Sequence, residues 1–495
     1  MSTTRPSVSP RPGAARALRV VAAKELRESL RDGRFRLLAA SVFLLLAAGL
    51  STGWLETREA HRAIDGARHA ERTTWLDQGP RNPHSAAHFG NYAFKPRPAL
   101  ASLDRGVDAY LGTAVWLEAH WQDPFALRPA EDRTAVQRFG ELTAAFTLQV
   151  LAPLLIIVLG FGTVAGERER GTLRQLASLG LGPRTLVLGK GIGLGAALGL
   201  VLVPAAVVAA ALAAGAAPGG EAEGGGLSGG LALFGVYAVY FVTWLALVLA
   251  VSSWADRART ALVVLLGFWM LQALVVPRLV ADLAERTHPI PTPRAFFAAI
   301  AEDSARGMDG RGTPAERRQA LEGRVLAEYG VDSVAELPIN FAGLALQDSE
   351  EHANLVYDKH YGDLWGRYLA QERLHLWGAA LSPRLAVRSL SMAVAGTDIA
   401  RHRHFADAAE QHRRKLVKFL NDDMTENAGE ASFGYLADEA LWEASPTFSY
   451  RPPDLGTALG RQGPAFAWLG AWLLAGFGLA ALAVRRLRIL PGARP

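Results

Sequence analysis

Six long apolar stretches limit what this chain of 495 residues can fold into. An α-helix rises about 1.5 Å per residue, so about 20 apolar residues cross a hydrocarbon core roughly 30 Å thick. Backbone groups in lipid must be satisfied within their own segment, and each stretch is therefore predicted to be a helix. We predict spans at residues 37–55, 142–165, 186–217, 231–253, 260–280 and 465–484. The alternative, buried helices of a soluble core, fails because a soluble fold would not bury six such runs.

Composition supports a membrane protein and excludes several kinds of site. Half of the residues are hydrophobic and 20% are charged, which is too apolar for an ordinary soluble protein of this size. The net charge of +5 could suggest a nucleic-acid partner, but the basic residues crowd beside the apolar runs. We therefore expect membrane lipids as partners and no nucleic acid. Cysteine is absent, which excludes disulfides, thiol nucleophiles and cysteine metal sites.

Charge in the short flanks predicts how the spans are oriented. Residues 1–36 carry nine Lys or Arg against three acids, so this end is expected in the cytoplasm. The loop at 166–185, the loop after the fourth span and the tail at 485–495 are also basic, whereas the loop at 217–230 has two Glu and no base. Both termini are thus predicted to be cytoplasmic. A signal peptide is the competing interpretation of the first span, but 36 residues are too long for its basic region.

The same alternation places two long segments, residues 56–141 and 281–463, on the outer side. Both have mainly helical patterns, as at 313–329 and 398–420, broken by Pro-rich pieces. Neither shows the regular alternating strands of a sandwich or barrel. The sequence thus predicts an all-α integral membrane protein with one mainly helical extracytoplasmic domain formed by both segments.

An amphipathic helix is predicted just before the first span. Apolar residues recur at helical spacing and charged residues fill the other side, which is typical of a helix lying in the membrane interface. The apolar residues are Leu18, Val21, Ala22, Leu26 and Leu30. A simple basic flank without a defined helix is the alternative.

The segment at residues 166–190, directly after the second span, is the most informative short stretch. Glu167 and Glu169 are expected in the first turn of a short helix, where carboxylates complement its positive end. Leu173 and Leu176 would give this helix an apolar face. Such a helix, joined rigidly to two spans, could transmit force from a docked cytoplasmic partner. An ordinary solvated loop is the alternative.

These two segments resemble the permeases of the type-2 exporter class of ATP-binding-cassette (ABC) transporters. The resemblance rests on KELRESLRDGRF at residues 24–35, on GERERGTLRQL at residues 166–176, and on the long outer loop between them. It implies an elbow helix that includes Lys24, Glu25, Leu26, Arg27, Arg31 and Phe35. It also implies a coupling helix that inserts into a nucleotide-binding subunit, with its core at Glu167, Glu169, Gly171, Thr172 and Leu173.

The resemblance implies partners and a location as well. The permease would work in the bacterial cytoplasmic membrane with a separate ABC ATPase that binds ATP and Mg, and with a second copy of itself or a paralogous permease. Its substrate would be an exported amphipathic or lipid-like molecule. The chain departs from most such permeases in its large outer segments. It is more similar to a branch that has two such segments and a stretch like residues 381–405.

The chain itself has no recognisable ATPase site. A phosphate-binding loop needs GxxxxGK followed by Ser or Thr. The nearest candidate is Gly189-Lys190, where Arg184 occupies the first glycine position and Gly191 replaces the hydroxyl residue. We therefore expect no catalytic residues and no cofactor bound by this chain. Lys190 is expected to extend to lipid headgroups.

The spans contain three polar residues of interest, Gln149, Thr243 and Gln272. They could line a translocation path or simply bond across helices. The spans hold no carboxylate or histidine relay, which argues against a proton-driven transporter. Pro153 and Pro204 are expected to bend the second and third spans.

Histidines gather in the outer segments, where His402 and His404 are the candidates for a metal site. Their spacing matches no common zinc signature, so we predict no bound metal and ordinary surface or core histidines. Two other functions stay open. One is a membrane-anchored, metal-dependent enzyme with its site in the outer domain. The other is a non-transporting scaffold for envelope assembly or for transmitting force.

Overall fold

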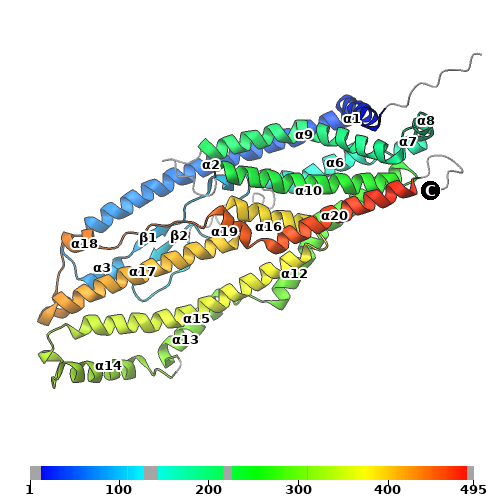
Figure 1. The fold of residues 1–495 in the computed structure, drawn as a ribbon. Coiled ribbons are helices and arrows are strands. Elements are labelled where there is room, and N and C mark those ends of the chain that lie inside the picture. The colour runs from blue at the N-terminus through cyan, green and yellow to red at the C-terminus, as the bar shows by residue number, and fades with distance from the viewer. Residues whose placement is uncertain (1–12, 109, 127–142, 216–225, 309, 488–495) are drawn as a thin grey trace, which may run out of the picture.

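The computed structural model describes residues 13–108, 110–126, 143–215, 226–308 and 310–487. Six helical segments in this part of the chain are long and apolar enough to cross a membrane, which confirms the predicted fold class. They pack side by side at one end of an elongated molecule, and a large, mainly helical domain occupies the other end (Figure 1). The loop expected at 217–230 lies mostly outside the described residues, as does most of the tail expected at 485–495.

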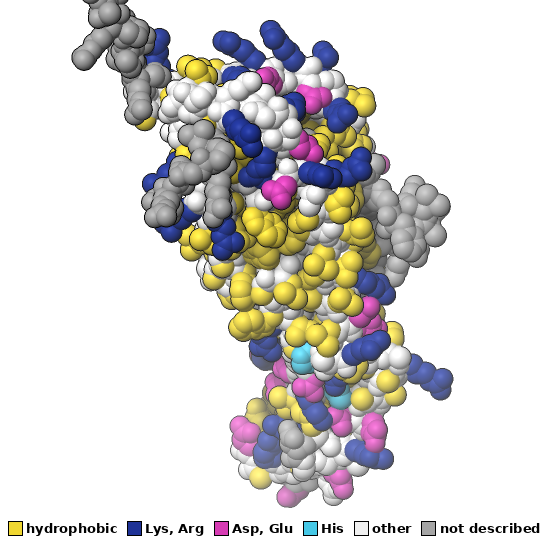
Figure 2. Space-filling view, turned by 90° about the vertical axis from the view of Figure 1, so that its right-hand side faces the viewer, with side chains coloured by type: hydrophobic (Ala, Val, Ile, Leu, Met, Phe, Trp, Pro, Cys, Tyr) yellow, Lys and Arg dark blue, Asp and Glu magenta, His cyan; other side chains and the backbone are white. Residues whose placement is uncertain are grey.

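The spans are built as follows. The first is α2 (Gly33–Leu76), the third α9 (Pro183–Gly215), the fourth α10 (Gly226–Trp254) and the sixth α20 (Gly463–Arg486). The second consists of α5 (Ala144–Phe146), the π-helical η2 (Thr147–Leu151), α6 (Ala152–Gly160) and α7 (Ala165–Glu169). The fifth consists of α11 (Ala258–Met270), the π-helical η3 (Leu271–Val275) and α12 (Val276–Thr287). Figure 2 shows hydrophobic side chains across the middle of the molecule, with charged side chains gathered at both ends.

The first span continues far beyond the predicted residues 37–55. At about 1.5 Å per residue, the 44 residues of α2 extend about 66 Å, more than twice the thickness of a hydrocarbon core. The added part is charged but contains no proline, so nothing in the sequence ends the helix. Near its end, Trp75 is buried against Trp442 of the large domain. The helix therefore joins the spans to the large domain without a break.

The large domain combines one small sheet with many helices. Its sheet pairs β1 (Asn91–Phe94) with β2 (Ala114–Leu117) in antiparallel fashion. Its α-helices are α3 (Pro83–Phe89), α13 (Pro293–Arg306), α14 (Pro314–Tyr329), α15 (Phe341–Gly378), α16 (Pro383–Ala395), α17 (Ile399–Asn427), α18 (Glu439–Ala444) and α19 (Leu455–Gly460). Three 3-10 helices are η1 (Ala99–Ser102), η4 (Val334–Glu336) and η5 (Gly429–Gly434).

The two helices predicted at 313–329 and 398–420 are confirmed, and their start signals explain them. Thr313 and Glu316 form a reciprocal capping box at the start of α14. The Asp398 carboxylate accepts the backbone N–H of Arg401 at 3.0 Å and caps α17. In both cases a side chain satisfies a backbone donor that the first helical turn leaves free.

One helix of the large domain packs among the spans. The α16 residues Leu385, Ala386, Val387 and Leu390 are buried in the same hydrophobic core as α10 and α20. The predicted outer segment 281–463 therefore does not stand apart from the bundle. Instead, its centre reaches into the helices that cross the membrane (Figure 1).

Two prolines explain where the spans depart from regular α-helix. A proline lacks the N–H that would bond the carbonyl four residues earlier. Pro153 frees the carbonyl of Gln149, which accepts the Tyr240 hydroxyl at 2.8 Å. Pro277 frees the carbonyl of Ala273, which accepts the Arg384 guanidinium. The π-helical segments lie just before these prolines, whereas α9 continues through Pro204.

Candidate functional site

The candidate site lies at the end of the bundle opposite the large domain. Here α1 (Ala14–Arg31), α7, α8 (Thr172–Ser178) and the C-terminal end of α20 come together (Figure 1).

The predicted elbow is confirmed as a helix, but it ends at Arg31. Phe35, which the resemblance placed in the elbow, instead lies in the first turn of α2 and is buried. Asp32 separates the two helices because its carboxylate caps α2 through the backbone N–H of Arg34.

The helix α1 packs directly on α9 because two glycines allow a close approach. A Cβ atom at Gly189 would lie 2.8 Å from the Val21 Cβ, and one at Gly193 would lie 2.6 Å from the Ala22 carbonyl oxygen. Glycines four residues apart form the small-residue contact that lets two helices approach closely in membranes. The predicted apolar stripe of α1 therefore faces α9 at Val21, whereas Leu30 is exposed.

Glu167 lies in the first turn of a short helix, as predicted, but that helix is α7, which continues the second span and ends at Glu169, and the Glu167 side chain is buried. Leu173 and Leu176 belong to a different helix. The separate short helix is α8, which begins after Gly171 at a φ of 73° that favours glycine. The Thr172 hydroxyl donates to the Glu167 carbonyl at 3.2 Å and closes this turn. Of the two predicted acids, only Glu169 is exposed.

A buried ion cluster connects these elements, and Lys190 is its centre. The Lys190 ammonium lies 2.7 Å from Glu25 of α1 and 2.9 Å from Glu167 of α7. Its side chain is only 3% exposed, so the expectation that it extends to headgroups is wrong. Lys24 adds a second cation 3.5 Å from Glu167. The buried Lys190 is therefore paired with two carboxylates, as burial of charge requires, and the half-exposed Lys24 also contacts Glu28 at 3.2 Å.

An apolar contact holds α8 beside the ion cluster. Leu173 is buried in a core that joins α1, α8, α9 and α10. The other buried members of this core are Val21, Val164, Leu186, Val187, Leu194, Leu249 and Leu487. The preceding α7 is held as well, because its Arg168 guanidinium donates to the Ser253 carbonyl at 2.8 Å and to the Ala255 carbonyl, at and just after the end of α10. The short helix α8 and the segment before it are therefore packed firmly against the spans.

The remaining face of α8 and its flanks is open to solvent. Exposed side chains here are Glu169, Arg170, Arg174, Gln175 and Leu179. Leu179 is 73% exposed. The surface thus combines an apolar side chain with charges of both signs, and charged residues are common at the rim of protein-docking surfaces.

Comparison with known families agrees with this arrangement. The family model of ABC-2 family transporter proteins matches residues 19–328, which is more than half of the chain. The chain belongs to the ABC-2 transporter family. A second model, a domain of unknown function called DUF3526, matches residues 295–451 of the same permease. A comparison with curated proteins gave no match.

In this ABC-2 permease the three predicted polar residues of the spans are buried. The Gln149 side-chain amide donates to the Tyr237 hydroxyl at 3.1 Å. The Ser382 hydroxyl donates to the backbone carbonyl of Gln272 at 2.8 Å and lies 3.4 Å from its side-chain Oε1. The Thr243 hydroxyl bonds within its own helix, to Val239. An apolar cavity of about 220 Å³ lies between α2, α9 and α10, but these three residues do not line it. Gln149 and Gln272 thus connect helices.

The structure does not bring His402 and His404 together. Residues two apart on a helix face different directions. The His402 Nδ1 lies 3.4 Å from the Lys95 ammonium, whereas the His404 Nδ1 lies 3.2 Å from the Tyr450 hydroxyl. Burial and the nearby Lys95 lower the pKa of His402 to about 3.

Within the described residues, the histidines that lie together are His84, His88 and His120. This cluster was not predicted from the sequence, although the four-residue spacing of His84 and His88 could have indicated it.

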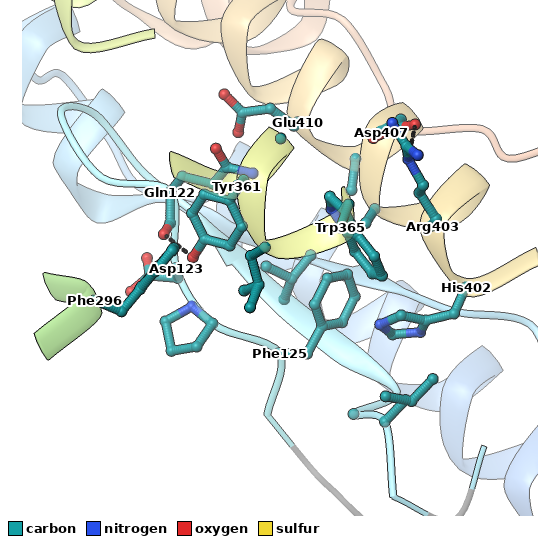
Figure 3. Close-up of a pocket in the computed structure, with 18 of the residues that line it drawn as sticks. Gln122, Asp123, Phe125, Phe296, Tyr361, Trp365, His402, Arg403, Asp407 and Glu410 are labelled. Atoms are coloured by element: carbon teal, nitrogen blue, oxygen red, sulfur yellow. Dashed lines mark hydrogen bonds and ion pairs between the residues drawn. The ribbon is translucent and has the colours of Figure 1, made fainter. Parts of the chain in front are cut away.

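The large domain of the permease contains a cavity of about 790 Å³. Figure 3 shows aromatic side chains along it, from Phe125, Phe296, Tyr361 and Trp365, with charged Asp123, Arg403, Asp407 and Glu410 nearby. The rings of Phe125 and His402 pack with centroids 4.6 Å apart. Burial, with the neighbouring Glu118, raises the pKa of Asp123 to about 6. Apolar walls with a few charged groups are typical of ligand sites.

We predict that Gly193→Ala loosens α1 from α9. The new methyl group would overlap a backbone oxygen, which cannot move aside, so we expect a loss of about 1–3 kcal/mol in stability. The measurement is thermal unfolding of the purified permease, followed by Trp fluorescence. Gly199→Ala on the same helix is the matched control because its Cβ would meet nothing within 4 Å. Equal melting of both variants would contradict close α1–α9 packing.

Proposed function

We propose that this permease couples ATP hydrolysis on a separate ATPase subunit to the export of an amphipathic or lipid-like substrate. The observation that carries the proposal is the buried contact of Lys190 with Glu25 and Glu167. It joins the elbow helix, the end of the second span and the start of the third. A push on α8 would therefore move these elements as one body.

The exposed side of α8 is the proposed docking surface for the ATPase. It is small, it lies at the tip of the bundle, and among the described residues nothing covers its Leu179, which is exposed. The chain has no phosphate-binding loop, so ATP and Mg are expected on the partner. By the family resemblance, a second copy or a paralogous permease completes the complex.

The cavity of the large domain supports the proposed substrate class. Its aromatic walls suit an apolar group, and its charged residues suit a polar head (Figure 3). The cavity includes Ile290 and Pro291, which lie three and four residues after the end of the fifth span. A molecule leaving the spans could thus be received by the large domain.

The proposed orientation places the α8 end in the cytoplasm and the large domain outside, in a bacterial cytoplasmic membrane. The excess of Lys and Arg in residues 1–36 and in the short loops supports it. The large domain lies at the opposite end of the spans, as this orientation requires (Figure 1).

We predict that Glu169→Lys weakens ATPase docking. The residue is exposed beside α8, so reversal of its charge should change the docking surface and leave the buried ion cluster intact. The measurement is recovery of the ATPase subunit with tagged permease, expressed together with its neighbouring genes. The matched control is Glu328→Lys, an equal charge change at an exposed site of α14.

Two results would contradict this docking model. One is wild-type permease that never recovers an ATPase subunit. The other is equal loss of the ATPase in both variants, which would indicate a general effect of charge. Normal recovery and ATPase stimulation without substrate flux would favour the scaffold function over export.

The orientation has its own test, which the absence of cysteine makes simple. We predict that a membrane-impermeant maleimide labels Ala335→Cys in intact spheroplasts and labels Ser178→Cys only after lysis. Both positions are exposed, one in η4 of the large domain and the other in α8. Labelling in the reverse order would overturn the proposed sidedness.

A further inference from the structure

Three histidine side chains lie close together within the large domain, far from the ion cluster. His84 and His88 lie one turn apart on α3, a short helix that Asn82 caps and Pro83 begins. His120 lies three residues after the end of β2. The three rings lie close together, with centroid separations of 4.7, 5.1 and 5.2 Å. Two histidines four residues apart on a helix can bind one metal ion from the same face.

The distances fit the ligand shell of a tetrahedral metal. The Nε2 atoms of His84 and His88 lie 3.2 Å apart. Two nitrogens bound to zinc at about 2.0–2.1 Å in tetrahedral geometry would be about 3.3–3.4 Å apart. One nitrogen from each of the three side chains lies within 4.8 Å of the others, so small side-chain rotations bring the third into place.

Glu350 positions the third histidine. Its carboxylate lies 2.6 Å from the His120 Nδ1 and accepts the His120 backbone N–H at 2.6 Å. This contact places the ring proton on Nδ1 and leaves the Nε2 lone pair for a metal. Carboxylates behind histidine ligands are a common feature of zinc sites. His120 also has a φ of 67°, a strained backbone conformation for a residue other than glycine.

The carboxylate itself is firmly held. Glu350 is buried on α15 and lies 3.2 Å from the Arg413 guanidinium of α17. Arg413 is 1% exposed and also contacts Glu410 at 2.9 Å and Asn354 at 2.6 Å. The long helices of the domain thus fix the position of His120 through Glu350.

The histidine cluster is partly open to solvent, because His84 and His120 are half-buried. His88 is exposed, so one side of the cluster is open for a water molecule or another fourth ligand.

We propose that His84, His88 and His120 bind a divalent transition-metal ion of the zinc type, with Glu350 as the residue that positions His120. Three nitrogen ligands suit zinc and its neighbours in the first transition row, whereas magnesium and calcium prefer oxygen. This site goes beyond the proposed export function, because neither α8 nor the ion cluster takes part in it. Unlike His402 and His404, whose side chains point to different partners, these three histidines lie close enough to bind one metal ion.

The test uses the full chain, purified in detergent without a polyhistidine tag and stripped with a chelator. After incubation with Zn²⁺ and removal of free ion, elemental analysis should find one zinc per chain in wild type. We expect that His84→Ala, His88→Ala and His120→Ala each lose most of it. His69→Ala is the matched control, because His69 is exposed on α2 outside the cluster, and it should keep wild-type zinc. Glu350→Gln should lower zinc affinity about 10–100-fold.

Two readouts keep the test decisive. His88 is exposed, so His88→Ala should retain the wild-type melting temperature of the metal-free protein and still lose zinc. Co²⁺ added in place of Zn²⁺ should give the visible absorption of a tetrahedral ion in wild type but not in His88→Ala. Wild type with no stoichiometric zinc, or equal zinc in wild type and His88→Ala, would overturn the proposed site.

Discussion

The contact of the Lys190 ammonium with Glu25 and Glu167 is the interaction on which the rest of this end of the molecule depends. A charge buried this deeply must be paired, and removing one partner of a buried pair typically costs about 3–5 kcal/mol. The elbow helix and the second and third spans therefore cannot separate without exposing or orphaning a charge. Gly189 and Gly193 bring α1 close enough for Glu25 to reach this lysine, and Leu173 places α8 beside it. The short helix is thus a rigid extension of the spans.

Hydrogen bonds between buried polar groups also connect the spans to the large domain, because buried polar groups need partners. Pro277 frees a carbonyl at Ala273, and the guanidinium that satisfies it comes from Arg384 of α16. The Tyr237 hydroxyl of α10 lies 3.0 Å from the Ser391 hydroxyl, which in turn donates to Asp104 at 2.5 Å. Because α10 also contributes Leu249 to the core around α8, this one helix contacts both the core around α8 and the large domain. Packing and hydrogen bonds thus provide a continuous physical connection from α8 to the large domain.

Local patterns in the sequence predicted much of this fold. Apolar length indicated the six spans, and helical periodicity indicated the elbow and the helices at 313–329 and 398–420 of the large domain. Contacts between distant residues could not be predicted in this way. Glu25 and Lys190 are 165 positions apart, so nothing near the lysine shows that it is paired. Likewise, His120 meets His84 and His88 only because the β1–β2 pairing brings β2 back toward α3.

The central claim is that the buried cluster transmits movement between the ATPase and the spans. The most direct measurement is the ATPase activity of the purified complex with Lys190→Glu alone and with Lys190→Glu combined with Glu167→Lys. The single variant places three carboxylates together and should lose the stimulation of ATPase activity by the permease. The combined variant restores an opposite charge at the same contact and should regain much of it. Wild-type stimulation in a folded, assembled Lys190→Glu complex would contradict the account.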